Sequence, residues 1–130
     1  LVGSEMCIRD RIFVVDDSAT MLMSVRSSLE MNGFKVETAS DGVEALDRLN
    51  SMSPDLIITD MNMPRMGGME LIQALRAMSK FRFTPSLTLT TESESSKRDQ
   101  AKRLGATGWL VKPVPAMDLA KIIKQVLPGA

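Results

Sequence analysis

The 130-residue chain contains no histidine and a single cysteine, Cys7. Without histidine, Ser-His catalytic sites and histidine metal sites are excluded, and one cysteine excludes an internal disulfide. Basic and acidic residues number 16 each, so no net charge draws the chain to nucleic acid or to an anionic membrane. Carboxylates, hydroxyls and lysines must therefore carry any chemistry, and we expect the cytoplasm as the compartment.

Long apolar runs are also missing. No stretch reaches membrane-spanning length, and residues 1–11 lack the apolar core of a signal peptide. The chain does not open with Met, and residues 2–7 show neither helical nor strand periodicity. We therefore expect residues 1–11 to be a non-native or disordered extension. Residues 12–130, in a chain that is 44% hydrophobic, are expected to form one compact domain.

Five short runs alternate with amphipathic stretches along the rest of the chain. The runs predict strands at residues 12–15, 34–38, 56–58, 86–90 and 108–111. Four predicted helices have apolar stripes at helical spacing: Met21, Leu22, Val25 and Leu29; Val43, Leu46 and Leu49; Leu71, Ile72, Leu75 and Met78; Leu119, Ile122, Ile123 and Val126. A fifth helix, over residues 93–104, is charged almost all round. This alternation predicts an α/β fold with one doubly wound parallel sheet covered on both faces.

Two local signals predict where helices begin and end. Asn32-Gly33 is typical of a helix that ends in a left-handed residue. Asp41 precedes Glu44 by three residues, which is typical of a capping box with Asp41 as the N-cap.

Asp60 comes two residues after the apolar run at residues 56–58, and it is the candidate for chemistry. Taken alone, an acid after a strand is more often a loop or capping residue. In open α/β sheets, however, ligands bind outside the carboxyl ends of the strands. Further polar residues come at such ends: Asp16, Asp17, Thr90 and Lys112.

Three converging carboxylates would repel one another unless a cation joined them. Mg²⁺ prefers oxygen ligands and commonly bridges carboxylates to phosphate oxygens. We expect Asp17 and Asp60 to be direct ligands, with Asp16 acting nearby or through water. The alternative is that Asp16-Asp17-Ser18 only caps the following helix.

Lysine and threonine complete the predicted site. Lys112 supplies a point charge for a phosphoryl oxygen or a carboxylate, and Thr90 can donate its hydroxyl. Either residue could instead be an ordinary surface lysine or strand-end threonine. Together the set describes a carboxylate nucleophile, Asp60, that accepts a phosphoryl group without needing a general base.

These residues resemble a known family. Asp16-Asp17, Asp60-Met61-Asn62-Met63-Pro64, Thr90 and Lys112-Pro113 resemble the receiver domain of two-component response regulators, most closely the stand-alone chemotaxis type, over residues 12–127. The resemblance implies a flavodoxin-like, CheY-like sheet of order 2-1-3-4-5 flanked by five helices. It also implies a cis Lys112–Pro113 bond.

The resemblance further implies the roles of the site residues. Asp60 would take a phosphoryl group from a sensor histidine kinase or a histidine phosphotransfer protein. Mg²⁺ would be held by Asp17, Asp60 and the backbone carbonyl of Asn62, with Asp16 beside them. Lys112 and Thr90 would contact the phosphoryl group. The protein would then be a phosphoacceptor with Mg²⁺-dependent self-dephosphorylation. It would not be an enzyme that turns over a separate substrate.

Output and lifetime also follow from the resemblance. Thr90 would couple to Trp109 as a switch, although Trp109 could simply be a core aromatic residue. Asn62 and Glu92 stand at positions that tune hydrolysis and predict a short-lived phosphoryl group, and Thr91 narrows access to it. The helix at residues 93–104, the last strand and the last helix would form the output surface.

Several partners and rival functions remain open. The expected output is binding to a flagellar motor switch protein or another chemotaxis component, by a monomer. A phosphate sink or relay without output, and the receiver of a longer regulator, are the alternatives. A haloacid-dehalogenase-like phosphatase is disfavoured because Asn62 replaces its second aspartate. A flavodoxin-like carrier is disfavoured because Asp16-Asp17 would repel its phosphate.

Overall fold

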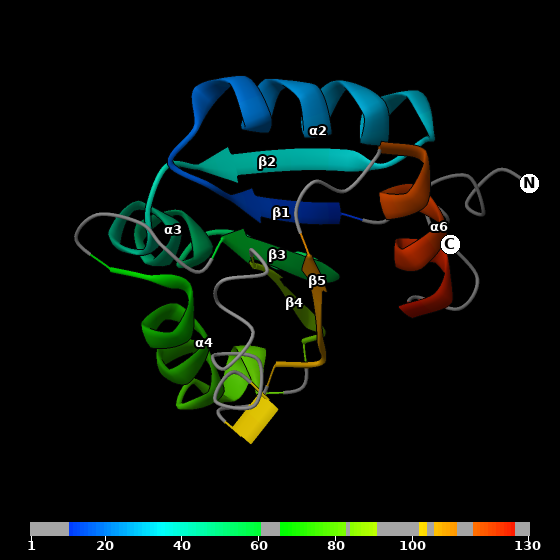
Figure 1. Cartoon of the computed structure of the whole chain (residues 1–130). Coiled ribbons are helices and arrows are strands. Elements are labelled where there is room, and N and C mark those ends of the chain that lie inside the picture. The colour runs from blue at the N-terminus through cyan, green and yellow to red at the C-terminus, as the bar shows by residue number, and fades with distance from the viewer. Residues whose placement is uncertain are drawn as a thin grey trace, which may run out of the picture.

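The structure, a computed structural model, describes residues 11–60, 66–82, 84–90, 102–103, 106–111 and 116–126. In chain order the elements are β1 (Arg11–Val15), α2 (Ala19–Met31), β2 (Lys35–Ala39), α3 (Gly42–Leu49), β3 (Leu56–Asp60), α4 (Gly68–Arg76), the 3-10 helix η1 (Ser79–Phe81), β4 (Ser86–Thr90), β5 (Gly108–Val111) and α6 (Ala116–Val126). The strands form one parallel sheet of order β2-β1-β3-β4-β5, with helices on both faces (Figure 1). The predicted doubly wound sheet and its strand order are confirmed.

Four of the five predicted α-helices lie in the described part of the chain. The helix predicted over residues 93–104 falls mostly outside the described residues, although Lys102 and Arg103 are helical and exposed. None of the described helices is both long enough and apolar enough to cross a membrane.

The first strand begins at Arg11, one residue before its predicted start. Arg11 pairs with Lys35 of β2. Its backbone N–H also donates to the Asp55 carboxylate at 2.9 Å, and the Asp55 N–H donates to the Arg11 carbonyl at 2.8 Å. These bonds bring Arg11 into the sheet, while the remainder of the predicted extension, residues 1–10, lies outside the described residues.

One face of the sheet packs against α2 and α6. Because side chains alternate along a strand, Ile12 and Val14 point to this face. They form one apolar cluster with the buried residues Val25 and Leu29 of α2 and Leu119 and Ile123 of α6. The predicted stripes of these two helices are therefore confirmed, with Met21, Leu22, Ile122 and Val126 half-buried at the margin.

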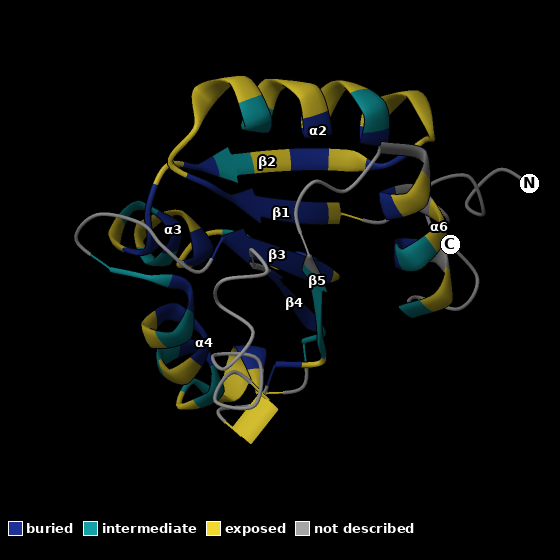
Figure 2. Cartoon of the chain, viewed as in Figure 1, coloured by how far each residue is buried: buried dark blue, intermediate teal, exposed yellow. Residues whose placement is uncertain are grey.

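The opposite face packs against α3 and α4. The buried residues of this second cluster are Phe13, Val15, Ala39, Ala45, Leu49, Ile57, Leu71, Leu75 and Phe81. Covering both faces leaves β1 and β3 almost wholly buried (Figure 2), as their continuous apolar runs predict.

Two residues of the predicted stripes lie elsewhere. Val43 is 41% exposed, because α3 turns Ala45 and Leu49, four residues apart, toward the sheet. Met78 follows the end of α4 and precedes η1, where it is half-buried against the second cluster.

The predicted helix ends are confirmed. Gly33 has a φ of 92°, a left-handed conformation that glycine adopts without strain. Asp41 is the N-cap of α3 and accepts the Glu44 N–H at 2.8 Å. The Glu44 carboxylate in turn accepts from the Ser40 N–H at 2.7 Å and the Ser40 hydroxyl at 2.8 Å, and these hydrogen bonds, the backbone one first, lower the pKa of Glu44.

The polar residues of β4 are buried because their hydroxyls have partners. Ser86 and Thr88 are both fully buried. The Ser86 hydroxyl accepts from Arg76 at 3.3 Å, and the Thr88 hydroxyl donates to the Gly108 carbonyl at 3.5 Å. Satisfied hydroxyls cost little to bury, so a strand with alternating hydroxyls is stable inside the sheet.

Arg76 ties the end of α4 to the start of β4. Its guanidinium donates to the Phe81 carbonyl at 2.7 Å as well as to Ser86, and burial lowers its pKa. We predict that Arg76→Met, which keeps the apolar stem, lowers the free energy of unfolding by about 1.5–3 kcal/mol, the usual loss for hydrogen bonds of a charged group. Urea denaturation measures this effect. Arg82→Met, at an exposed arginine, is the control, and equal losses in both variants would contradict the role of Arg76.

Candidate functional site

Three carboxylates meet at the carboxyl edge of the sheet. Asp16 and Asp17 directly follow β1, and Asp60 is the last residue of β3. Because β1 and β3 are neighbours in register, with Val15 opposite Thr59, these acids leave adjacent strands side by side. One carboxylate oxygen from each of the three lies within 4.8 Å of the others. The predicted convergence of Asp16, Asp17 and Asp60 is confirmed.

The three acids differ in burial. Asp16 is 1% exposed and Asp60 is 6% exposed, whereas Asp17 is exposed. The Asp16 backbone N–H donates to the Ala39 carbonyl at 3.1 Å, and its carboxylate accepts the Ser18 N–H at 2.9 Å. Asp16 is thus held at the base of the cluster, while Asp17 forms its side toward the solvent.

The capping alternative applies to Ser18 and not to the two acids. Ser18 is the N-cap of α2, and its hydroxyl accepts the Met21 N–H at 3.2 Å. Asp16 only orients this turn through its bond to the Ser18 N–H. Capping therefore does not account for Asp17 or for the approach of Asp60.

The donor set suits a hard cation. At such separations each pair of negative charges costs roughly 3 kcal/mol at an effective dielectric of about 20, and less where water reaches Asp17. All the candidate ligand atoms are carboxylate oxygens, and one acid faces solvent. Mg²⁺ binds in this way, through one or two carboxylates and several retained waters. The residues present therefore fit a divalent cation.

The remaining predicted site residues are only partly described. Thr90 ends β4, one residue beyond Leu89, which pairs with Asp60. Trp109 in β5 is half-buried and pairs with Thr88, and the last residue of β5, Val111, pairs with Thr90. The predictions for Asn62, Thr91, Glu92, Lys112 and the Lys112–Pro113 bond lie outside the described residues.

One contact beside the site was not predicted from the sequence. The Gly42 N–H, at the start of α3, donates at 3.1 Å to the carbonyl of Met66, six residues after Asp60. The signal in the sequence was limited to a glycine at the start of a predicted helix, where the backbone N–H has no partner inside the helix.

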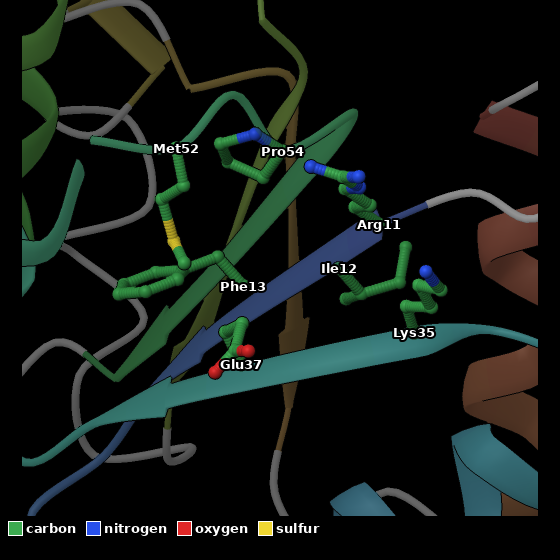
Figure 3. A pocket seen from close by; sticks show the side chains of 7 residues that line it. All are labelled: Arg11, Ile12, Phe13, Lys35, Glu37, Met52 and Pro54. Carbon is green, nitrogen blue, oxygen red and sulfur yellow. The ribbon is translucent and has the colours of Figure 1, made fainter. Parts of the chain in front are cut away.

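A hollow of about 250 Å³ lies at the other end of the sheet (Figure 3). It is lined by Arg11, Ile12, Phe13, Lys35, Glu37, Met52 and Pro54. These residues belong to the amino ends of β1 and β2 and to the segment before β3, far along the strands from the carboxylates. Its charged lining residues are Arg11, Lys35 and Glu37, so charges of both signs border the hollow.

Comparison with known proteins identifies relatives. The model of the response regulator receiver domain family matches residues 12–124. The chain is 38% identical over 117 residues to the transcriptional regulatory protein PrrA of Mycobacterium leprae, which covers 90% of this chain and 49% of that protein. It is 39% identical over 117 residues to the response regulator MprA of Mycobacterium avium, covering 90% and 50%. The chain thus spans about half the length of these curated relatives.

Solved structures agree with this match. The chemotaxis response regulator CheY4 of Vibrio cholerae superposes with a TM-score of 0.87 and 44% identity, covering 92% of this chain and 99% of that one. The family match, the strand order and the three acids at the sheet edge all confirm the resemblance seen in the sequence. The chain belongs to the response regulator receiver domains of two-component signalling.

Proposed function

We propose that Asp60 accepts a phosphoryl group from a phosphohistidine of a sensor kinase or a histidine phosphotransfer protein. The observation that carries the proposal is the approach of the Asp16, Asp17 and Asp60 carboxylates to within 4.8 Å at the carboxyl edge of the sheet. The three carboxylates would repel an anionic phosphoryl group. A divalent cation bound by the same carboxylates neutralises their negative charge and allows Asp60 to approach phosphorus.

The transfer needs no general base, because the Asp60 carboxylate has no proton to lose. A carboxylate oxygen of Asp60 attacks phosphorus, a P–O bond forms, and the P–N bond to the histidine breaks with its electron pair leaving on the imidazole nitrogen. Mg²⁺, held by Asp17, Asp60 and the Asn62 carbonyl beside Asp16, would neutralise the charge of the carboxylates and phosphoryl oxygens. Lys112 and Thr90 contact the phosphoryl group in this proposal.

Loss of the phosphoryl group is part of the same proposal. Water attacks phosphorus, the P–O bond to Asp60 breaks, and inorganic phosphate leaves. Asn62 and Glu92 tune this step, and their identities favour a short lifetime. The chain is then a self-dephosphorylating acceptor without a separate substrate to turn over.

Output would depend on Thr90 and Trp109. Trp109 lies opposite Thr88, two pairs before the pair of Thr90 with Val111, so movement at the end of β4 can reach Trp109 along the two paired strands. A switch from 1:99 to 99:1 needs about 5.5 kcal/mol of differential stabilisation. Two or three new charge-assisted hydrogen bonds, at roughly 1.5–3 kcal/mol each, supply that amount.

Two outputs have support. The match to 99% of the CheY4 chain favours a monomeric cytoplasmic receiver that binds a chemotaxis partner such as a flagellar motor switch protein. The curated relatives, twice as long and including one named a transcriptional regulator, favour a receiver that controls a second domain. Neither output gives this domain a nucleic-acid or membrane contact of its own. A partner that binds the phosphorylated chain alone distinguishes both outputs from a phosphate sink.

The test uses the chain with a small phosphodonor such as acetyl phosphate. We expect one phosphoryl group per chain, dependent on Mg²⁺ and labile in alkali as an acyl phosphate is, together with a change in the fluorescence of Trp109, the single tryptophan. Beryllofluoride with Mg²⁺ should produce the same fluorescence change. No incorporation, or an alkali-stable product, would overturn the proposal.

A further inference from the structure

We infer that Gly42 and Met66 are positioning residues for the carboxylate site. Their contact fixes Met66, six residues after Asp60, relative to the end of β2, where the Ala39 carbonyl accepts the Asp16 N–H. The inference rests on the proposed function, because it gives the contact a role in Mg²⁺ binding and phosphoryl transfer.

The contact is close and leaves no room for a side chain at position 42. A Cβ atom placed on Gly42 would lie 2.5 Å from Cγ and 2.7 Å from Cβ of Met66, distances that real Cβ atoms do not show. These atoms are next to the Met66 backbone, so a change of rotamer at the end of the side chain does not relieve the overlap. The 3.1 Å bond from the Gly42 N–H to the Met66 carbonyl holds the two backbones together.

Helix formation does not explain this glycine. Among the described glycines only Gly33 has a positive φ, so Gly42 is not retained for its backbone conformation. Gly42 is the first residue of α3, and helix starts leave N–H groups without partners inside the helix. One of these N–H groups binds the Met66 carbonyl, and the missing side chain allows that approach.

The same corner of the chain also holds Asp16. The Ala39 carbonyl, at the end of β2, accepts the Asp16 N–H at 3.1 Å, and three residues later Gly42 binds Met66. This corner lies between β2 and α3 (Figure 1). The turn after β1 and the chain six residues after Asp60 are therefore attached to one short segment, residues 39–42.

Displacing this corner should disturb the metal ligands without removing any. A methyl group at position 42 must push Met66 away or shift the start of α3, and either movement changes the spacing of the acids. Groups that orient metal ligands typically change metal affinity by about 10–100-fold when altered. For Gly42→Ala we expect Mg²⁺ binding to weaken about 10-fold, with all three carboxylates present.

The experiment compares Gly42→Ala, Met66→Gly and the double variant with the unaltered chain. Calorimetry gives the Mg²⁺ dissociation constant, acetyl phosphate at saturating Mg²⁺ gives the phosphorylation rate, and urea gives the stability. Because Met66→Gly removes both overlapping atoms, Cβ and Cγ, the double variant should bind Mg²⁺ within about twofold of Met66→Gly alone, as expected for coupled neighbours.

Gly108→Ala is the matched control. Its Cβ would lie 3.3 Å from Cδ2 of Leu87, a milder crowding at the amino end of β5, away from the acids. It should lose some stability and keep the Mg²⁺ affinity. Met66→Val, which crowds the contact from the other side, replaces Gly42→Ala if that variant does not fold.

The outcomes separate the two proposals. If the unaltered chain neither binds Mg²⁺ nor takes up phosphate, the proposed function fails. If it does both while Gly42→Ala and Met66→Val match it in Mg²⁺ affinity, or the double variant shows no rescue, the positioning role is wrong and the proposed function stands.

Discussion

Replacement of Asp60 with alanine is expected to abolish phosphoryl incorporation completely. Asp60 is the last residue of the buried strand β3, and its carboxylate is the proposed nucleophile. Neither neighbouring acid can replace it. Asp16 is 1% exposed and its carboxylate is engaged by the Ser18 N–H, whereas Asp17 leaves a different strand and faces the solvent.

Intact-mass spectrometry after incubation with acetyl phosphate and Mg²⁺ measures phosphoryl incorporation directly. Asp47→Ala is the matched control, because Asp47 is an exposed acid on α3 that lies outside the cluster. The control should be phosphorylated like the unaltered chain. A phosphorylated Asp60→Ala protein that is alkali-labile would mean that another carboxylate is the acceptor.

Replacement of Asp17 with asparagine is expected to shift stability in opposite directions with and without Mg²⁺. Without the ion, removing one of three close negative charges relieves repulsion, and the gain is up to about 1 kcal/mol because Asp17 is exposed and screened. With Mg²⁺ at 100 times its dissociation constant, the unaltered chain gains about 2.7 kcal/mol, and most of that gain should be lost in the variant.

Chemical denaturation in EDTA and in Mg²⁺ measures both changes. Asp118→Asn, at an exposed acid in the first turn of α6, is the control and should keep the full stabilisation by Mg²⁺. The metal site as proposed is wrong if Asp17→Asn is stabilised by Mg²⁺ as strongly as the unaltered chain.

Much of the fold was predictable because each element carries its own pattern. The continuous run at residues 56–58 predicted a strand buried on both faces, and β3 is buried throughout. The buried face of α3 was harder to predict. Val43 and Ala45 both fit an apolar face, and only packing against the sheet determines which of them is buried. Burial of Ser86 could not be predicted from a local pattern either, because its hydrogen-bond partner Arg76 is ten residues away.

The site was predictable to the extent that it depends on strand ends. Asp16, Asp17 and Asp60 follow apolar runs, and parallel strands bring such ends to one edge. Their spacing and unequal burial depend on the twist and register of the sheet, which no local pattern specifies. The Gly42–Met66 contact joins residues 24 positions apart, so no local pattern predicts it.

The two apolar clusters share no side chain, since alternate residues of each strand belong to opposite layers. The corner at residues 39–42 and Met66 belong to the layer built with α3 and α4, whereas α2 and α6 rest on the other layer. We therefore expect that substitutions on the exposed surface of α2 and α6 can alter partner binding without changing the packing around residues 39–42 and Met66.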